Sequence, residues 1–233
     1  MTDPTIGAAV RRQNDGILQF IERPTLRWLA VTMPAWVSPD MLTAAGFAGM
    51  VVAAAGYGLA SRNSAMLWLA SAGLMINWFG DSLDGTVARV RGIERPRYGF
   101  FIDNSTDVLE YAVFAVGMGL SGYLRWELAF AGLAAFYMMM LIELIKARAT
   151  DVLQIAFAGV GLTEVRAVFI VLNAVMVFVP PTPFSIAGVT TTYPNVISAL
   201  WIVIQVATYI VVMVKTARSL AAKEPPLFVG RPP

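Results

Sequence analysis

The acidic residues of this sequence gather in residues 80–110, between two apolar segments. Six of the fifteen Asp and Glu residues lie there: Asp81, Asp84, Glu94, Asp103, Asp107 and Glu110. One charged side chain near the centre of a bilayer costs roughly 2.5–3.5 kcal/mol on the mildest insertion scale. The stretch therefore needs groups that neutralise its charge, and such a concentration of acids indicates a functional site.

The spacing of these acids predicts a metal site. Asp81 and Asp84 are three residues apart, and Asp103 and Asp107 are four apart, so each pair shares one face of a helix. A loop of about nine residues joins the two helices, which must then run antiparallel and can bring the pairs together. Four carboxylates repel one another unless cations neutralise them. We expect two Mg²⁺ or Mn²⁺ ions, the arrangement that supports phosphoryl transfer.

Two residue types that serve many enzymes are absent, since the chain contains no His and no Cys. This excludes Ser-His-Asp triads, thiol nucleophiles, disulfides and zinc sites built from His or Cys. Acid–base chemistry must then come from carboxylates, Lys, Tyr or water. A bound metal must be a hard cation held by oxygen.

Two other interpretations of the acids remain open. The acids could pair with the arginines of the loop at 90–98, or they could mark a path for protons or cations. The arginines lie mostly in the loop rather than on the helices. The acids crowd toward one side of the membrane, as Glu143 also does, and form no chain across it. Both observations favour the metal site.

The segments around the site predict an all-α integral membrane protein. Hydrophobic residues make up 58% of the chain, charged residues 14%, and the mean hydropathy is +0.67. We expect N-terminal cytoplasmic or interfacial amphipathic helices in residues 1–37, with a new start at Pro24, and a polar cytoplasmic tail in 216–233. The membrane domain, residues 38–215, should contain six transmembrane helices, at about 41–60, 65–89, 99–123, 128–145, 161–179 and 195–214. An uncharged loop is expected at 184–194.

The basic residues orient these helices. With both termini inside, only Arg62 and Arg125 of the seventeen Lys and Arg residues fall outside. This distribution follows the positive-inside rule and places both termini and the acidic stretch on the cytoplasmic side. We expect the membrane to be the cytoplasmic membrane of a bacterium or an archaeon.

The residues beside the acids suit a phosphate. Gly85 and Ala88 keep one helix face open to close approach, and Arg89 offers a forked donor to a phosphate group. Gly99, one turn before Asp103, could leave the same space on the second helix. Each glycine alone is more often a packing residue in membrane helices.

These residues together resemble the signature of the CDP-alcohol phosphotransferase family, DxxDGxxAR-x(8 or 9)-GxxxDxxxD. The sequence DSLDGTVAR is followed after nine residues by GFFIDNSTD. All eight fixed positions match: Asp81, Asp84, Gly85, Ala88, Arg89, Gly99, Asp103 and Asp107. Upstream, SPDMLT at 38–43 is similar to the family's Pro-Asn-x-x-Thr, with Asp40 in place of Asn. The resemblance covers roughly residues 20–215.

The resemblance implies an enzyme of phospholipid biosynthesis. It would transfer a phospho-alcohol group, here a phosphatidyl group, from a CDP-linked donor such as CDP-diacylglycerol to an alcohol, and release CMP. Asp81, Asp84 and Asp103 would be metal ligands, and Asp107 would complete the metal site or act as general base. Gly85, Ala88, Arg89 and Gly99 would line the CDP pocket. The resemblance also implies a homodimer among membrane lipids, with no nucleic acid as partner.

The signature does not specify the acceptor. A phosphorylated acceptor could be bound by Arg91, Arg95, Arg97, Lys146, Arg148, Glu164 and Arg166, although the positive-inside rule alone accounts for most of these cations. The alternative is a CDP-choline or CDP-ethanolamine phosphotransferase that acts on a lipid alcohol, because GLTE at 161–164 resembles the Gly-Pro-Thr-Glu of that branch. An aspartate-rich prenyltransferase would be expected to carry a second Asp motif, and a cation transporter would function without CDP compounds.

Overall fold

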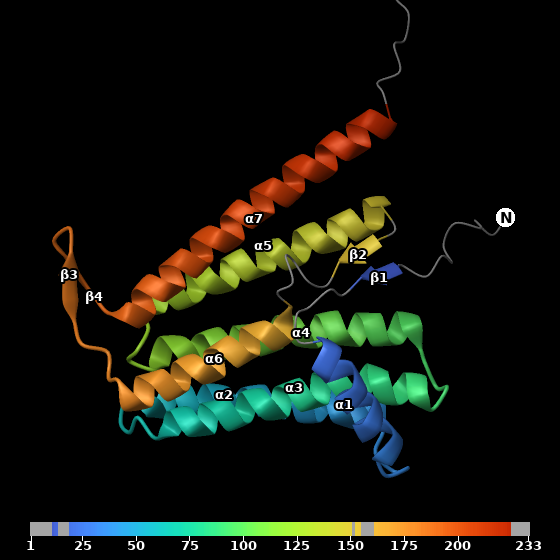
Figure 1. The fold of residues 1–233 in the computed structure, drawn as a ribbon, viewed down its shortest axis with the longest axis horizontal. Coiled ribbons are helices and arrows are strands. Elements are labelled where there is room, and N and C mark those ends of the chain that lie inside the picture. The colour runs from blue at the N-terminus through green and yellow to red at the C-terminus, as the bar shows by residue number, and fades with distance from the viewer. Residues whose placement is uncertain (1–10, 14–18, 151, 155–160, 225–233) are drawn as a thin grey trace, which may run out of the picture.

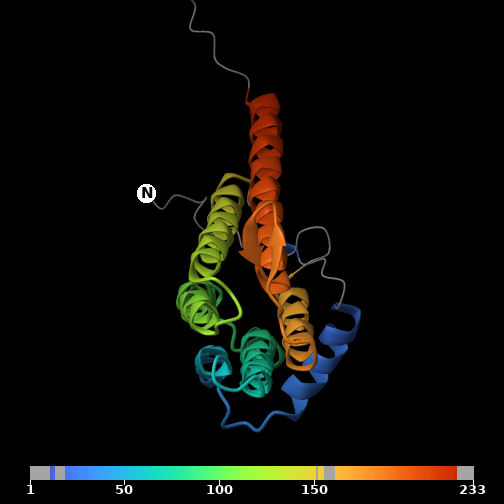
Figure 2. The same ribbon diagram turned by 90° about the vertical axis from the view of Figure 1, so that its left-hand side faces the viewer.

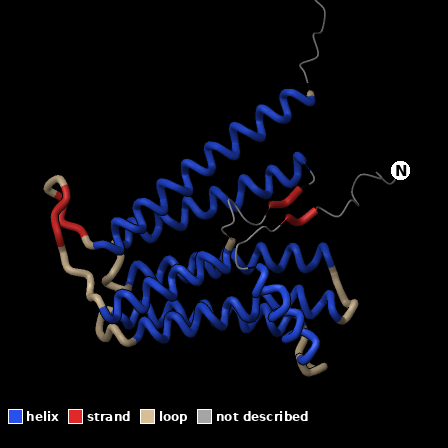
Figure 3. Tube along the Cα trace, viewed as in Figure 1, coloured by secondary structure: helices blue, strands red, loops and turns tan. Residues whose placement is uncertain are grey.

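The computed structural model describes residues 11–13, 19–150, 152–154 and 161–224. Helices dominate these ranges (Figure 1): α1 (Gln19–Thr32), α2 (Pro39–Ala60), α3 (Met66–Val90), α4 (Pro96–Leu120), α5 (Trp126–Thr150), α6 (Leu162–Phe178) and α7 (Tyr193–Lys223). Strand β1 (Arg11–Gln13) pairs in parallel with β2 (Val152–Gln154), and β3 (Phe184–Ile186) pairs antiparallel with β4 (Val189–Thr191). Figure 3 shows the two strand pairs near opposite ends of the molecule.

The helices occupy the segments predicted from hydropathy, and their first residues follow from local chemistry. α2 begins at Pro39, two residues before the uncharged run, because Ser38 caps it: the Met41 amide donates to Ser38 Oγ over 3.2 Å. α4 likewise begins at Pro96 rather than near residue 99. Proline is favoured in the first helical turn, where its missing N–H leaves no bond unmade.

Several expectations about the ends of the chain are wrong in detail. Pro24 lies within a continuous α1, and residues 11–13 form a strand instead of a helix. α7 continues to Lys223, so the first part of the expected tail is helical. The expected loop at 184–194 contains the β3–β4 hairpin, whose turn residues Ala187 and Gly188 have φ of 49° and 81°, as a tight hairpin turn requires. Residues 1–10, 14–18 and 225–233, where further helices and tail were expected, lie outside the described residues.

The helices pack around α3. It contacts α2, α6 and α1, while α4 contacts α2 and α5, and α5 contacts α7. In Figures 1 and 2, α2, α3, α4 and α6 form a compact group, and α5 and α7 extend away from it. α3 and α4 run antiparallel, as predicted, and both pack on α2.

The α2–α3 contact is close because small residues face one another. A Cβ on Gly80 would lie 2.5 Å from the Gly46 nitrogen and 2.7 Å from its Cα, and would also overlap the Leu42 carbonyl oxygen. Only glycine permits this approach of two backbones. Gly80 directly precedes Asp81, so the close packing fixes the part of α3 that carries the acids.

A fully buried polar group ties three of these helices together. Tyr57 on α2 donates to Asn173 Oδ1 on α6 over 2.9 Å, and Asn173 Nδ2 donates to Ser71 Oγ on α3 over 3.1 Å. Hydrogen bonds between helices suit a surrounding that offers no water.

Among the described helices, α2, α5 and α7 are long and apolar enough to cross a membrane. α3 and α4 carry the acids, and α6 has 17 residues. The number of spans, six by prediction, stays a prediction.

Candidate active site

The structure brings the predicted acids of α3 and α4 together. Asp84 interacts electrostatically with Asp81 and with Asp103, and Asp107 interacts with Asp81 and Asp103. The i,i+3 and i,i+4 spacings keep each carboxylate pair on one face of its own helix. Glu110, one turn beyond Asp107, joins the same cluster through its interactions with Asp81 and Asp84.

Arg166 on α6 places a cation among these acids. Its Nη2 donates to Asp81 Oδ2 over 2.7 Å, and it interacts electrostatically with Asp107 and Glu110. The Arg166 side chain is only 7% exposed, whereas that of Asp81 is 31% exposed, so the cation is desolvated and the carboxylate is half-buried. Its Nε has no hydrogen-bond partner in the part of the chain that the structure describes. Such a donor is costly when it stays buried without a partner.

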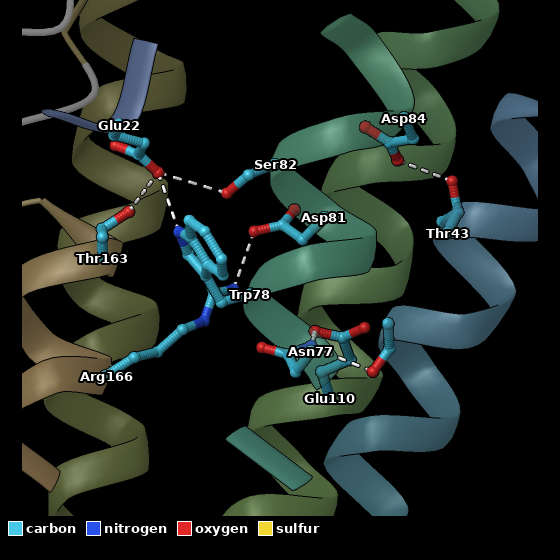
Figure 4. A network of polar contacts seen from close by, with 11 residues as sticks. Glu22, Thr43, Asn77, Trp78, Asp81, Ser82, Asp84, Glu110, Thr163 and Arg166 are labelled. Carbon is cyan, nitrogen blue, oxygen red and sulfur yellow. Dashed lines mark hydrogen bonds and ion pairs between the residues drawn. The ribbon is translucent and has the colours of Figure 1, made fainter. Parts of the chain in front are cut away.

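Two further acids of the cluster are held by neutral side chains. Thr43 on α2 donates to Asp84 Oδ2 over 2.6 Å, and Asn77 on α3 donates to Glu110 Oε2 over 2.7 Å. Asn77 also donates to the Gly46 carbonyl oxygen, which anchors it to α2. In Figure 4, Thr43 lies on the side of α3 away from Arg166, whereas Asn77 and Glu110 lie below Asp81.

Glu22 on α1 connects the N-terminal helix to the same region (Figure 4). Its Oε1 accepts hydrogen bonds from Trp78 Nε1 over 2.9 Å, from Ser82 Oγ over 3.3 Å and from Thr163 Oγ1 over 2.8 Å. Ser82 is the neighbour of Asp81, and Thr163 lies one helical turn before Arg166. One carboxylate oxygen therefore ties α1 to the two helices that carry the ion pair of Asp81 and Arg166.

The donor set suits a hard divalent cation, because all four predicted ligands are carboxylates. Across the described ranges, however, no three acidic side chains converge closely enough to hold one ion as they stand. Asp81 is turned toward Arg166, and Asp84 accepts from Thr43. The clustered charge and the chemistry of the ligands therefore fit a metal, which would require these side chains to reorient.

The residues expected to line a CDP pocket lie at the site's edge. Arg89 is exposed and folds back over Gly85, where a Cβ would lie 3.4 Å from its Nη1, and Arg89 donates to Thr86 over 3.0 Å. A Cβ on Gly99 would meet nothing within 4 Å. Ala88 is half-buried on the same helix.

The basic residues proposed for the acceptor fall into different environments. Arg91 donates to the Met33, Pro34 and Val37 carbonyl oxygens and so holds the turn between α1 and α2. Arg95 pairs with Asp40 over 3.0 Å and lies 4.0 Å from the centre of the Tyr98 ring. Arg91 therefore holds the turn before α2, and Arg95 joins α2 to the loop before α4.

The other acceptor candidates divide in the same way. Lys146 lies 3.5 Å from the buried Glu143 on α5, whereas Arg97 and Arg148 are exposed. Glu164 accepts from the Gly161 amide over 2.8 Å and caps α6. Arg166, by contrast, contacts Asp81 of the acidic cluster directly.

Comparison with known proteins agrees with the signature. The sequence matches the family described as CDP-alcohol phosphatidyltransferase over residues 36–211. The chain belongs to this family. It is therefore a transferase of phospho-alcohol groups, and it belongs to membrane-embedded enzymes that generally depend on divalent metals.

A curated relative has a more specific name. Over 103 residues the chain is 33% identical to the archaetidylinositol phosphate synthase of Pyrococcus horikoshii. The matched region is 44% of this chain and 52% of that protein. The chain thus spans about half the length of the relative that it matches.

Sequence reasoning missed several residues of this CDP-alcohol phosphatidyltransferase site. Asn77 lies four residues before Asp81, so helical spacing could have indicated it. Thr43 belongs to the motif at the start of α2, and that motif alone does not indicate its bond to Asp84. Glu22 is 56 positions from Trp78 and 141 from Thr163 in sequence, and no local pattern signals these contacts.

Proposed function

We propose that the protein transfers a phosphatidyl-type group from a CDP-linked lipid to a small alcohol and releases CMP. The observation that supports the proposal is that Asp81, Asp84, Asp103 and Asp107, from two helices, interact electrostatically, with Asp81 paired to the buried Arg166. Phosphoryl transfer depends on positioning and on stabilising negative charge, and this cluster offers residues for both.

Asp81, Asp84, Asp103 and Asp107 are the residues that would hold Mg²⁺ or Mn²⁺. When bound, the metal would neutralise the donor's pyrophosphate and the charge that develops on the leaving CMP. Asp107 is our candidate general base, which takes the proton of the acceptor hydroxyl as that oxygen attacks the phosphorus. A carboxylate suits this role in a chain without His.

Different residues would bind the CDP-linked donor and the acceptor alcohol. Gly85, Ala88 and Gly99 leave space beside the acids for the CDP group, and Arg89 can swing from Thr86 to a phosphate. For the acceptor we retain Arg166, whose Nε is available, and Lys146 and Arg148 near the end of α5. The relative's name supports inositol phosphate as the first acceptor to test.

The membrane arrangement is part of the proposal. Residues 38–215 would form one domain of six spans, α2 to α7, with both termini and the acids on the cytoplasmic side. Phe20, Trp28 and Trp36 are 73%, 64% and 72% exposed in and next to α1, and Arg23 and Arg27 lie between them. These residues suit a helix in the headgroup region. We retain a homodimer as an expectation from the family.

The test is CMP release by the purified protein in lipid nanodiscs. CDP-diacylglycerol, its archaetidyl counterpart and CDP-choline would each be paired with a panel of alcohols that includes inositol phosphate, glycerol phosphate, serine and diacylglycerol. We expect metal-dependent release from a lipid donor with a polar acceptor, and loss of release in EDTA. CMP from CDP-choline with diacylglycerol would support the alternative, and no CMP from any pairing would contradict both.

The role of Asp107 has its own test. Asp107→Asn should lower CMP release at saturating metal by about 10²–10⁴-fold, the usual contribution of a general base. Asp40→Asn is the matched control, because it makes the same change at an exposed residue paired with Arg95. Full activity of Asp107→Asn would show that Asp107 is not the base.

A further inference from the structure

An apolar cavity lies between α4, α5, α6 and α7, beside the acidic cluster. Its volume is about 100 Å³, several times the roughly 10–15 Å³ that one water molecule needs. Met118, Leu128, Phe136 and Phe169 contribute to its lining. A cavity lined in this way is unfavourable for water and suits a hydrocarbon chain.

One end of the cavity borders the acids. Tyr111 lines it one helical turn after Asp107 and interacts electrostatically with Asp107 and Arg166. From Tyr111 to Met118 the lining follows α4 for about 10 Å, away from the acids, at 1.5 Å per residue. The cavity therefore leads from the charged site into the apolar interior.

Gln205 on α7 supplies a polar group at that same end. A Cβ on Gly132 would lie 3.9 Å from Ile202 Cγ1, and α5 and α7 run in the same direction (Figure 1). Gln205, nearly one turn beyond Ile202, is therefore level with residues just beyond Gly132, toward Phe136. The Phe136 ring packs on Tyr111 with the ring centres 3.9 Å apart.

The side-chain amide of Gln205 lacks a hydrogen-bond partner among the described residues. Gln205 is only 8% exposed and lines the cavity, yet no described residue forms a hydrogen bond with its side chain. An amide that faces hydrocarbon groups without a hydrogen-bond partner is unfavourable. Its position therefore indicates a ligand that brings an oxygen to this end of the cavity.

We propose that the cavity receives one hydrocarbon chain of the CDP-linked lipid donor, and that Gln205 donates a hydrogen bond to the oxygen that joins this chain to glycerol. The inference rests on the proposed function, which places the donor's phosphates at the acids. The order of groups in such a lipid, phosphates, then ester or ether oxygens, then hydrocarbon, matches the order of acids, Gln205 and apolar lining. A water-soluble CDP-alcohol would neither occupy the cavity nor accept a hydrogen bond from Gln205.

Gly132→Leu tests the cavity by filling it. Gly132 lines the cavity, and Ile202 is the one described neighbour that a Cβ there would meet within 4 Å, so a larger side chain can enter without a backbone clash. Gly58→Leu is the matched control, since a Cβ there meets only Leu120 Cβ at 3.9 Å and Gly58 lies outside the cavity.

The readout is the KM for CMP release with CDP-dioleoylglycerol and with CDP-dihexanoylglycerol. We expect Gly132→Leu to raise the KM for the long-chain donor at least tenfold and to change that for the short-chain donor less than twofold. Gln205→Leu should raise both, because the oxygen that it meets is present in both donors. Gly58→Leu should change neither. Equal effects of Gly132→Leu on the two donors, or no effect, would contradict the proposal.

A binding measurement decides the question without catalysis. Trp201 lines the cavity, so a CDP-diacylglycerol with brominated chains should quench a fluorescence component that is absent in Trp201→Phe and reduced in Gly132→Leu. Equal quenching by brominated phosphatidylcholine would assign the cavity to bulk lipid, and quenching by brominated diacylglycerol alone would assign it to a lipid acceptor. Either result would overturn the donor assignment. If wild type bound the donor in this way but released no CMP, the proposed function would fail while the cavity assignment stood.

Discussion

Gly80→Ala should damage both the stability and the activity of the protein, although alanine is the better helix former. A Cβ at this position would lie 2.5 Å from the Gly46 nitrogen, whereas ordinary contacts begin at 3.4 Å. α2 and α3 would therefore have to separate by about 1 Å. Overpacking of this kind costs about 1–3 kcal/mol, and a misplacement of about 1 Å near the chemistry can lower the rate about 10²-fold. Asp81, the next residue, would move with the helix.

The experiment compares Gly80→Ala with Gly58→Ala. At Gly58 the new Cβ meets only Leu120 Cβ at 3.9 Å, so the change gains helix propensity of about 1 kcal/mol without a clash. The temperature of thermal unfolding, followed by circular dichroism, and the rate of CMP release should both fall in Gly80→Ala. Gly58→Ala should keep its activity and keep or raise its unfolding temperature. If both variants behaved alike, the close contact of α2 and α3 would not be what positions Asp81.

Three further predictions follow from the polar contacts. Glu22→Ala should lower the free energy of unfolding by about 1–3 kcal/mol, because three hydrogen-bond donors lose their shared acceptor. The control Glu94→Ala, at an exposed site, should change this free energy by less than about 0.5 kcal/mol. Equal losses in the two variants would contradict the role of Glu22. Arg91→Ala should lower stability in the same assay and leave the KM for the acceptor unchanged; a raised KM at unchanged stability would instead assign Arg91 to the acceptor. Arg166→Met should lower the free energy of unfolding by about 1–3 kcal/mol, because Asp81, which is half-buried, loses its charged hydrogen-bond partner, and adding Asp81→Asn should restore stability but not CMP release. Restored activity in that double variant would refute a catalytic role for both residues.

The sequence predicts those features of the site that depend on the spacing of residues within one helix. Asp81 and Asp84, or Asp103 and Asp107, share a helix face whatever the rest of the chain does. Their meeting required only that the two helices run antiparallel, which a short loop ensures. The signature was therefore sufficient to predict the family, and the hydropathy pattern was sufficient to predict which segments form helices.

Long-range contacts could not be predicted in this way. Arg91 and Arg166 are both basic residues near the inner ends of helices, and nothing in the sequence distinguishes them. The structure shows one holding three backbone carbonyls at a turn and the other buried against Asp81. The role of each depends on which elements fold against it, and the same applies to Glu22, whose partners lie on α3 and α6.

The charge balance of the site explains why one arginine is not enough. Asp81, Asp84, Asp103, Asp107 and Glu110 carry five negative charges when ionised, and Arg166 supplies one positive charge. Two divalent cations, as proposed, would bring this group to neutrality before any substrate arrives. The pyrophosphate of the donor would then add charge that the buried residues cannot balance, so cations at the edge must meet it. Arg89, which is exposed and hydrogen-bonded to Thr86, is the side chain that we propose for this contact when the donor is bound.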